Sequence, residues 1–439
     1  MSSWVLRFYA LLMWLAQPFV RRKLARRSLL EPGYGEAIEE RFGHYTQAAE
    51  TTSTLVWVHA VSLGETRTAA ILLKALRAQY PGLRLLLTHG TATGRAEGRA
   101  LLRPGDIQVW QPWDSQAVVT RFFTHFKPRL GLLIETEIWP LTVAAAKKYA
   151  VPLVLVNGRL SEKSLQQALH MSPLSYPAYG ALAKVLVQTD DDARRFRQLG
   201  VAPAVVLGNL KFDAAPDAQQ QATGKAWRQA LGQPVLMFAS SREGEEADFF
   251  RQISALRQQI QGANAMNSVA PVVKVLVVPR HPQRFDEVQA LALQHGLSVS
   301  RRSSWAGRPL SNEDAMQADV WLGDSLGEMA LYYAMSDVAL LGGSFAPLGG
   351  QNLIEAAACA CPVVMGPHTF NFLEAAELAE ASGAALRVAD LQHGMQAALA
   401  LVNDAAAQAT AASAGLAFAD HNRGATAKTV AVLAPFLRA

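Results

Sequence analysis

The chain has 439 residues, of which 50% are hydrophobic and 18% charged, and a formal net charge of +5. This length exceeds what one hydrophobic core usually serves, so it predicts two domains of about 200 residues each, and the composition excludes a disordered or fibrous protein. Two cysteines, Cys359 and Cys361, are too few for a disulfide scaffold or a structural zinc site and indicate a reducing compartment.

The positive charge is concentrated at the N-terminus. Residues 1–27 contain six of the 41 basic residues and none of the 36 acidic ones, so the rest of the chain is nearly neutral. Its basic residues are scattered and are not interleaved with aromatic ones, as a nucleic-acid groove would require. We therefore expect no nucleic-acid partner.

An uncharged apolar run at residues 8–20 is followed by five cations within seven residues. A spanning helix needs about 17 to 25 apolar residues, and Arg7 and Pro18 make a full crossing marginal. A signal peptide carries its cations before the apolar run, so this segment should be retained. Trp4, Trp14 and the cations predict a membrane anchor that keeps the body on the cytoplasmic side, whether it spans or lies flat. The alternative is a first helix that packs on the protein itself.

Beyond residue 50, short apolar runs alternate with alanine-rich helical stretches, the pattern of a parallel sheet covered by helices on both faces. The first predicted sheet has strands at 55–58, 83–87, 131–134, 153–156, 185–187 and 205–207. The second has strands at 235–239, 272–278, 320–322, 338–341 and 362–365. An Ala/Gln-rich linker is predicted at 214–222. The expected fold is α/β with two doubly wound lobes, whose ligands bind beyond the carboxyl ends of the strands.

The first strand is followed by His59-Ala-Val-Ser62-Leu-Gly64-Glu65, which leads into a helix. Ser62 and Glu65 have the spacing of a capping box, in which both side chains serve backbone amides, and spacing alone favours that structural role. Against it, the helix dipole would keep the Glu65 carboxylate ionised. An ionised carboxylate at a strand end can act as a general base toward an alcohol.

Polar residues also follow the later strands of the first lobe. Glu135 and Glu137 end one apolar strand, and they either decorate the next helix N-terminus or contact substrate hydroxyls. Residues 157–161 supply an amide, a cation and a hydroxyl at an equivalent place. Lys211, in the segment 208–213, lies at the predicted hinge, from which it could reach both lobes.

The second lobe combines cations with glycine-rich turns. Arg280 follows a long apolar run and is suited to neutralising a phosphate. Residues 324–328 open a helix, and a glycine-rich segment at 342–350 leads to Asn352 and Glu355. Glycines before a helix let backbone amides approach an anion. Together these features indicate a nucleotide or nucleotide-sugar site.

Several common motifs are absent from the sequence. Residues 90–95 lack the Gly-Lys-Ser/Thr ending of a P-loop, and no strand is followed by G-x-G-x-x-G. The three acids Asp190 to Asp192 are explained as helix capping after Thr189. No H-E-x-x-H occurs, so we predict no structural or catalytic metal.

The ordered motifs together resemble one family over nearly the whole chain, the bacterial Kdo (3-deoxy-D-manno-oct-2-ulosonic acid) transferases of lipopolysaccharide synthesis. The matching segments are S-L-G-E-T at 62–66, T-A-T-G at 91–94, E-T-E-I-W-P at 135–140, N-G-R-L-S at 157–161, G-N-L-K-F-D at 208–213, V-P-R-H-P at 278–282, G-D-S-L-G-E at 323–328 and N-L-I-E at 352–355.

The resemblance implies a GT-B glycosyltransferase with two Rossmann-like domains facing a central cleft. It would transfer Kdo from CMP-Kdo to the lipid A precursor, lipid IVA, with inversion at the anomeric carbon, without an active-site metal or other cofactor, at the cytoplasmic face of the inner membrane. The expected domains are a membrane anchor with its basic flank at 1–27, an acceptor-binding domain at 28–213 and a CMP-Kdo-binding domain at 214–439. The motifs are silent on the oligomeric state and on the number of Kdo units added.

By the same resemblance, Glu65 matches the general base, and Glu135 and Lys211 match residues that stabilise the transition state. The implied CMP contacts are Pro279, Arg280, Leu326, Gly327, Glu328, Asn352, Leu353, Ile354 and Glu355. Three positions depart from the family pattern, and we assign them no role: Arg242 in a Ser-Arg pair where Thr-His is common, Gln351 where His is usual and Ala356 where Pro is usual.

Two other functions are compatible with this pattern. A GT-B enzyme that uses another nucleotide sugar, such as a UDP-sugar transferase or epimerase, would share the fold and would be distinguished by its donor. A non-catalytic bilobed binding protein has the same two-domain shape, but such proteins usually work after export, and the retained anchor argues against that.

Overall fold

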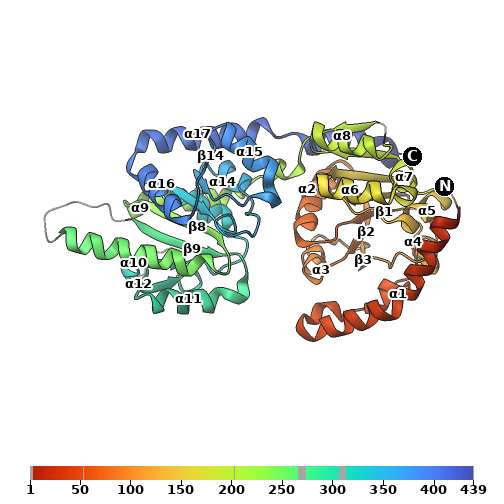
Figure 1. Ribbon diagram of the computed structural model, residues 1–439, viewed down its shortest axis with the longest axis horizontal. Coiled ribbons are helices and arrows are strands. Elements are labelled where there is room, and N and C mark those ends of the chain that lie inside the picture. Colours follow the sequence, from red (N-terminus) through yellow and green to blue (C-terminus); the bar gives the residue numbers. More distant parts are fainter. Residues whose placement is uncertain (1–2, 53, 202, 265–272, 306–312, 439) are drawn as a thin grey trace. The chain divides into compact units, whose positions relative to one another are not determined.

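The computed structural model describes residues 3–52, 54–201, 203–264, 273–305 and 313–438, which form two compact α/β units (Figure 1). Unit 1 contains residues up to Asp213 together with the C-terminal segment from Arg423, and unit 2 contains Ala214–Asn422. Each unit has a parallel sheet with helices on its faces. Two Rossmann-like domains were predicted, and this prediction is confirmed.

Unit 1 is built on a seven-stranded sheet. Its strands are β1 Leu55–His59, β2 Arg84–His89, β3 Ile107–Trp110, β4 Leu130–Ile134, β5 Leu153–Gly158, β6 Lys184–Val187 and β7 Ala204–Val206. Its α-helices are α1 Ser3–Leu30, α2 Leu63–Gln79, α3 Ala92–Arg99, α4 Gln116–Phe126, α5 Pro140–Lys148, α6 Glu162–His170, α7 Ser172–Gly180, α8 Asp190–Gln198 and α18 Ala425–Arg438, and its 3-10 turns are η1 Pro32–Tyr34, η2 Ile38–Phe42 and η3 Leu210–Asp213.

The strand order of unit 1, β3-β2-β1-β4-β5-β6-β7, reverses between β1 and β4. All neighbours are parallel, so the carboxyl ends of the strands lie along one edge. The loops after β1 and β4 therefore leave the sheet in opposite directions and open a crevice at that edge. Glu65 and Glu135 follow these two strands.

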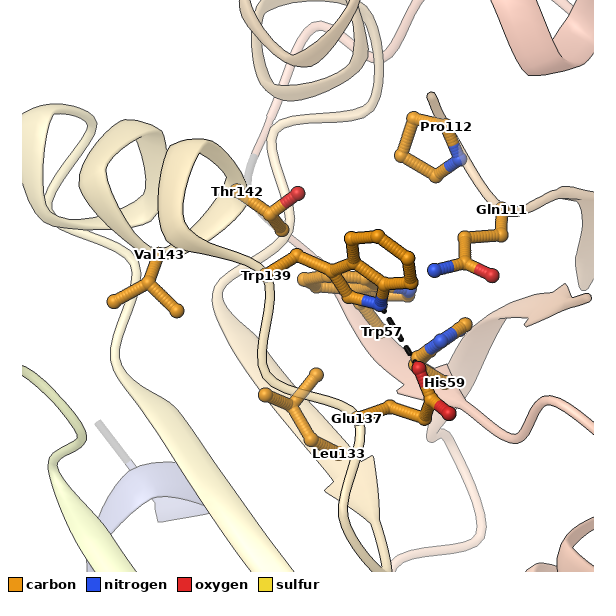
Figure 2. Close-up of a pocket in the computed structure, with 9 residues that line it drawn as sticks. All are labelled: Trp57, His59, Gln111, Pro112, Leu133, Glu137, Trp139, Thr142 and Val143. Atoms are coloured by element: carbon orange, nitrogen blue, oxygen red, sulfur yellow. Dashed lines mark hydrogen bonds between the residues drawn. The ribbon is translucent and has the colours of Figure 1, made fainter. Parts of the chain in front are cut away.

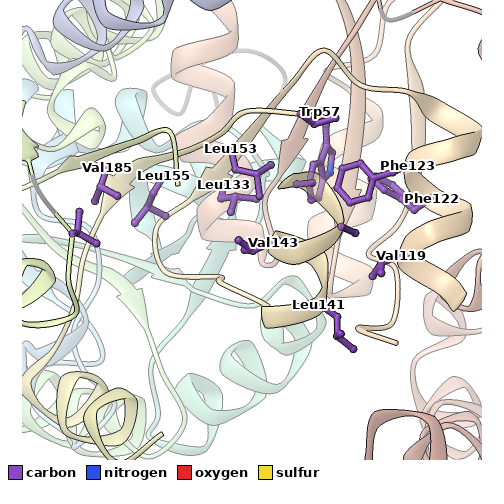
Figure 3. Packing of buried hydrophobic residues seen from close by; sticks show 14 of the residues in the cluster. Trp57, Val119, Phe122, Phe123, Leu133, Leu141, Val143, Leu153, Leu155 and Val185 are labelled. Carbon is purple, nitrogen blue, oxygen red and sulfur yellow. The ribbon is translucent and has the colours of Figure 1, made fainter. Parts of the chain in front are cut away.

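Alternate residues of β1 enter two hydrophobic cores, one on each face of the sheet. Trp57 packs against Phe122 and Phe123 of α4 (Figure 3), with 5.0 Å between the ring centroids of Trp57 and Phe122. Val58 lies in the opposite core, to which α2 and α18 also contribute. Both faces of β1 are thus held rigidly beneath the loop that carries Glu65.

The N-terminal helix α1 (red in Figure 1) packs on unit 1 by one side. The Tyr9 hydroxyl donates to Asp114 at 2.9 Å, and the Trp113 indole donates to the Met13 carbonyl at 2.8 Å. Leu6 also packs against the core. None of the helices in the described part of the chain combines the length and apolarity that a membrane crossing needs, so a spanning form of the predicted anchor is not supported.

Unit 2 repeats the architecture with a second seven-stranded parallel sheet. Its strands are β8 Val235–Ser241, β9 Lys274–Pro279, β10 Val299–Arg301, β11 Val320–Leu322, β12 Val338–Leu341, β13 Val363–Met365 and β14 Ala385–Arg387. Its α-helices are α9 Ala218–Leu231, α10 Glu245–Asn264, α11 Phe285–Gln294, α12 Glu313–Gln317, α13 Met329–Ala334, α14 Ile354–Ala358, α15 Leu373–Ala381, α16 Leu391–Asn403 and α17 Ala405–His421, and its 3-10 turns are η4 Pro282–Arg284, η5 Arg302–Ser304 and η7 Phe370–Phe372.

The strand order of unit 2, β10-β11-β9-β8-β12-β13-β14, reverses between β8 and β12. Every neighbouring pair is parallel, so the loops after β9, β11 and β12 leave from the same edge of the sheet. These loops carry the segments predicted to bind CMP.

Three strands were missed by the sequence analysis: β3, β10 and β14. Each is an edge strand, and each is short and contains a polar residue, so none presents the continuous apolar run of a strand buried on both sides. The strand predicted at 272–278 begins at Lys274, and position 272 lies outside the described residues.

The predicted division between residues 213 and 214 agrees with the two units, whereas the predicted linker and the C-terminal limit of the second domain need correction. The predicted linker at 214–222 is partly helical, because α9 starts at Ala218 with Asp217 as its N-cap. The domain predicted at 214–439 loses its last helix to unit 1, because Val430 and Leu433 of α18 are buried in the core that also contains α2. The alanine-rich sequence of α18 does not show which sheet it covers.

Asp213 ties the start of α18 to η3, and we predict that Asp213→Ala locally destabilises this helix. Its carboxylate accepts hydrogen bonds from the amides of Gly424 at 2.6 Å and Thr426 at 2.5 Å. Loss of a helix cap costs about 1 kcal/mol, so amide exchange in 425–438, measured by mass spectrometry, should accelerate about fivefold. Asp217→Ala, which removes the cap of α9, should leave that exchange unchanged; equal exchange in both variants would contradict the assignment.

Candidate active site

Glu65 lies at the start of α2, directly after β1 and the turn at Val61. The Ser62 hydroxyl oxygen caps the helix by accepting from the Glu65 amide at 3.4 Å. The Glu65 carboxylate accepts from the Val61 amide at 2.5 Å and from the Ser62 hydroxyl at 3.2 Å. Only half of the predicted capping box is formed, because the carboxylate binds the amide before Ser62 and not that of Ser62 itself.

The pKa of Glu65 is raised to about 7. Burial is the main cause, and the nearby charges of Glu135 and Glu137 add to it, while the hydrogen bonds from Val61 and Ser62 act in the opposite direction. The expectation that the helix dipole keeps this carboxylate fully ionised was wrong, because loss of solvent and like charge outweigh the dipole. A carboxylate with this pKa is matched to proton abstraction near neutral pH.

Glu135 and Lys211 form an ion pair, with 3.0 Å between the Lys211 Nζ and a Glu135 carboxylate oxygen. Their side chains are 18% and 21% exposed, so the pair is only partly screened by water. Lys211 lies on η3, and Glu135 directly follows β4. The structure therefore brings two predicted residues together, and the charge of Glu135 reaches Glu65.

Two residues at this sheet edge have left-handed backbone conformations that are uncommon without glycine: Glu135 with φ of 65° and Asn157 with φ of 56°. Asn157 is buried, and its side-chain oxygen accepts from the Leu210 amide at 2.9 Å. This bond fixes η3 beside the end of β5 and so positions Lys211. Asn157 thus acts by holding the backbone of η3. Uncommon backbone conformations such as those of Asn157 and Glu135 are concentrated at functional sites.

A small pocket opens between the ends of β1 and β4 (Figure 2). The Trp139 indole donates to the Glu137 carboxylate at 3.0 Å, a bond that is drawn in Figure 2. Burial raises the pKa of Glu137 and lowers that of His59 to about 3, so His59 is neutral. Gln111 also lines the pocket.

Sequence reasoning did not select His59, Trp139 or Gln111 as site residues. His59 is the last residue of β1, a position that could have marked it as facing the crevice, and Trp139 stands within the E-T-E-I-W-P segment. Gln111 follows β3, the strand that the apolar pattern missed.

In unit 2, the segments after β9 and β12 meet through a side-chain hydrogen bond. Pro279 ends β9, and the Arg280 guanidinium donates to the Gln351 side-chain oxygen at 3.0 Å. Gln351, to which we gave no role, thus orients a cation at the predicted phosphate site. Gly349, two residues earlier, has φ of 91°, a left-handed conformation that favours glycine, and a Cβ there would lie 2.3 Å from the side-chain nitrogen of Asn371.

The remaining predicted CMP contacts divide into exposed and buried side chains. Leu326 is exposed, Gly327 has φ of 79°, and Glu328 accepts from the Arg302 guanidinium at 2.9 Å. Leu353 and Ile354 are buried in the core and can offer only backbone groups to a ligand. The other two positions lie on either side of the start of α14 at Ile354. Asn352 precedes the helix and accepts from the Ile354 amide at 3.1 Å, and Glu355 lies in the first turn.

These features define a class: a glycosyltransferase with two Rossmann-like domains, carboxylates at the crevice of one sheet and a glycine-rich, cationic edge on the other. A profile of the family described as "3-Deoxy-D-manno-octulosonic-acid transferase (kdotransferase)" matches residues 36–214. The chain is 45% identical to the 3-deoxy-D-manno-octulosonic acid transferase of Bordetella pertussis, over 90% of this chain and 91% of that protein. The chain belongs to the 3-deoxy-D-manno-octulosonic acid (Kdo) transferases.

Other comparisons agree with this membership. The enzyme of the same name from Haemophilus influenzae is 29% identical over 98% of both chains. The crystal structure of Anabaena HepE in complex with UDP covers 87% of this chain and 100% of its own, with a TM-score of 0.56 and 17% identity, a likeness that concerns the fold alone.

We predict that Glu135→Gln lowers the pKa of Glu65. Removing the neighbouring negative charge, and freeing the positive charge of Lys211, both favour the ionised form, so the titration midpoint should fall by about half a pH unit or more. NMR of ¹³C-labelled glutamate, with the Glu65 signal assigned through Glu65→Gln, measures it. Thr136→Ala, which changes no charge in the same segment, serves as the control. A midpoint unchanged in Glu135→Gln would mean that the charge of Glu135 does not contribute to this pKa.

Proposed function

We propose that the chain is an inverting, metal-independent glycosyltransferase that moves Kdo from CMP-Kdo to the lipid A precursor, lipid IVA, in lipopolysaccharide core biosynthesis. One observation carries the proposal beyond family membership. At the switch point of unit 1, Glu65 has a pKa of about 7 and lies within the field of the Glu135–Lys211 ion pair.

In this mechanism, Glu65 takes the proton from an acceptor hydroxyl as its oxygen attacks the anomeric carbon of Kdo. The bond from that carbon to the CMP phosphate oxygen breaks with inversion, and CMP leaves with the electron pair. The negative charge of Glu135, which pairs with Lys211, stabilises the positive charge that develops on the sugar. No step requires a metal, because protein cations and helix N-termini can stabilise the departing phosphate.

The donor would bind at the carboxyl edge of the unit 2 sheet. There, Arg280 offers a cation that Gln351 orients beside a glycine-rich segment. Glu328 and Glu355 would accept from ribose hydroxyls.

We place the protein at the cytoplasmic face of the inner membrane, attached through the outer side of α1. The side of α1 that faces away from unit 1 exposes large apolar residues, among them Trp4, which is 69% exposed, and Phe19, which is 76% exposed. The exposed cations Arg22, Lys23 and Arg26 follow them. This order of aromatic and cationic side chains fits a helix that lies in the headgroup region of an anionic bilayer.

We predict that Glu65→Gln abolishes transfer, with a loss of about 10²- to 10⁴-fold in rate. The test incubates lipid IVA and CMP-Kdo with the protein and counts the added Kdo units by mass spectrometry. In the native enzyme, kcat/KM should rise as the pH increases through about 7, because the ionised form of Glu65 is the base.

The affinity for CMP should be nearly unchanged in this variant, and Glu97→Gln, a surface carboxylate in an ion pair with Arg67, should transfer normally. Undiminished turnover by Glu65→Gln would refute the base assignment. Turnover with UDP-sugars and none with CMP-Kdo would refute the donor.

We predict that Phe19→Glu weakens binding to vesicles that contain anionic phospholipid by about tenfold or more, since burying a Phe side chain contributes about 1.5–3 kcal/mol. Flotation of the full-length protein with vesicles measures it, and added salt should weaken binding further. Leu293→Glu changes an equally apolar exposed residue of unit 2 and should have no effect. Equal loss in both variants would contradict attachment through α1.

A further inference from the structure

A solvent-open groove of about 340 Å³ lies in unit 1 between α1, η1, η2 and the segments after β2, β3 and β4. Three of its lining residues are cations: Lys23 and Arg27 from α1 and Arg41 from η2. The rest of the wall is mainly apolar and aromatic, with Trp113 and Trp139 opposite α1. Cations above aromatic and aliphatic walls match an amphiphilic anion.

The groove adjoins the small pocket beside Glu137, because Gln111, Pro112 and Trp139 contribute to the walls of both cavities. Gly90 also lines the groove, and its amide donates to the carbonyl of Val61 at 3.0 Å. The turn that holds the Glu65 carboxylate is therefore hydrogen-bonded to a residue of the groove wall.

Arg41 is the best-placed cation for an anionic ligand. Its guanidinium is mostly buried, donates to the Gly90 carbonyl at 2.9 Å and lies 3.8 Å from the ring centroid of Trp110. Its Nε–H is buried without a hydrogen-bond partner among the described residues. Burial also lowers the pKa of Arg41 to about 10, which indicates that this charge lacks full compensation.

The other charged groups leave the groove positive. Arg27 pairs with Glu31 at 3.0 Å and covers the Tyr34 ring, while Lys23 is exposed on the same side of α1. The acid among the lining residues, Asp114, is buried and accepts from Tyr9, the Leu141 amide and Thr142. Both of its carboxylate oxygens are thus engaged by donors within the protein.

We propose that this groove binds a phosphate ester of the acceptor lipid, with Lys23 and Arg41 as the phosphate-binding residues and the aromatic wall against the adjoining sugar or acyl part. The proposal rests on the proposed function and assigns a site to the acceptor. An uncharged glycolipid would leave the buried Arg41 charge unpaired, which is costly. Because the apolar outer side of α1 faces the bilayer in our placement, an anionic headgroup would enter beside it.

The test compares lipid IVA with the same lipid after enzymatic removal of its phosphates, both in neutral detergent micelles. We expect the native protein to bind and turn over the phosphorylated lipid at least tenfold better in kcat/KM. Lys23→Ala and Arg41→Ala should reduce this preference to about threefold or less, mainly through KM. Arg41→Lys should restore part of it, because the charge but not the guanidinium fork is kept.

Arg26→Ala is the matched control, because it removes one cation from the same helix but does not line the groove. It should retain the preference for the phosphorylated lipid. Lys23 is exposed, so Lys23→Ala keeps the test meaningful even if Arg41→Ala fails to fold.

The proposal would be overturned if Arg26→Ala lost the preference for the phosphorylated lipid to the same extent. It would also be overturned if Lys23→Ala and Arg41→Ala lost kcat/KM equally on both lipids, because general surface charge would then explain the effect. Inhibition of native turnover by millimolar inorganic phosphate, competitive with the lipid, would support a phosphate site. Phosphate-dependent lipid binding without transfer of Kdo to either lipid would support the groove and refute the proposed function. Transfer of Kdo without a preference for the phosphorylated lipid would support the proposed function and refute the phosphate-binding groove.

Discussion

The candidate site depends on how three carboxylates are kept near one another at the end of a parallel sheet. Glu65, Glu135 and Glu137 are all partly buried, and the charges of Glu135 and Glu137 make Glu65 costlier to ionise. Lys211 pairs with Glu135 at 3.0 Å. No cation among the described residues pairs with Glu65, and burial together with the repulsion raises the pKa of Glu65 into the range of a general base. The ion pair therefore separates the roles of two chemically identical groups.

This separation requires the backbone to be held firmly. Glu135 and Asn157 adopt left-handed conformations at the ends of adjacent strands, β4 and β5. The surrounding structure must stabilise them, and it does so through a sheet whose residues are buried on both faces and through the Asn157 bond to the Leu210 amide. Asn157 thus positions Lys211 through the backbone of η3, and the ion pair with Glu135 positions the Lys211 side chain.

Much of this arrangement could be predicted from the sequence, for reasons that particular residues illustrate. Apolar runs predicted the central strands because these are buried on both faces, and strand ends located Glu65 and Glu135. The edge strands β3, β10 and β14 lacked that pattern, so Gln111 after β3 was missed. The return of α18 to unit 1 depends on which sheet buries Val430, a tertiary choice that helix periodicity does not encode. The pKa of Glu65 likewise depends on desolvation and on Glu137, which capping-box spacing does not reveal.

The two edges differ in how their charge responds to pH. In unit 2, Arg280 is oriented by the amide of Gln351, where the family usually has histidine, and an amide does not titrate. His281 beside it is also kept neutral, because burial and the neighbouring arginines lower its pKa. The donor edge therefore carries permanent positive charge across the neutral range. In unit 1, by contrast, Glu65 changes its protonation state near pH 7. The pH dependence of the proposed reaction thus arises on the acceptor side, where Glu65 takes the proton. The charge that the protein offers to the leaving nucleotide can stay constant while Glu65 becomes ionised.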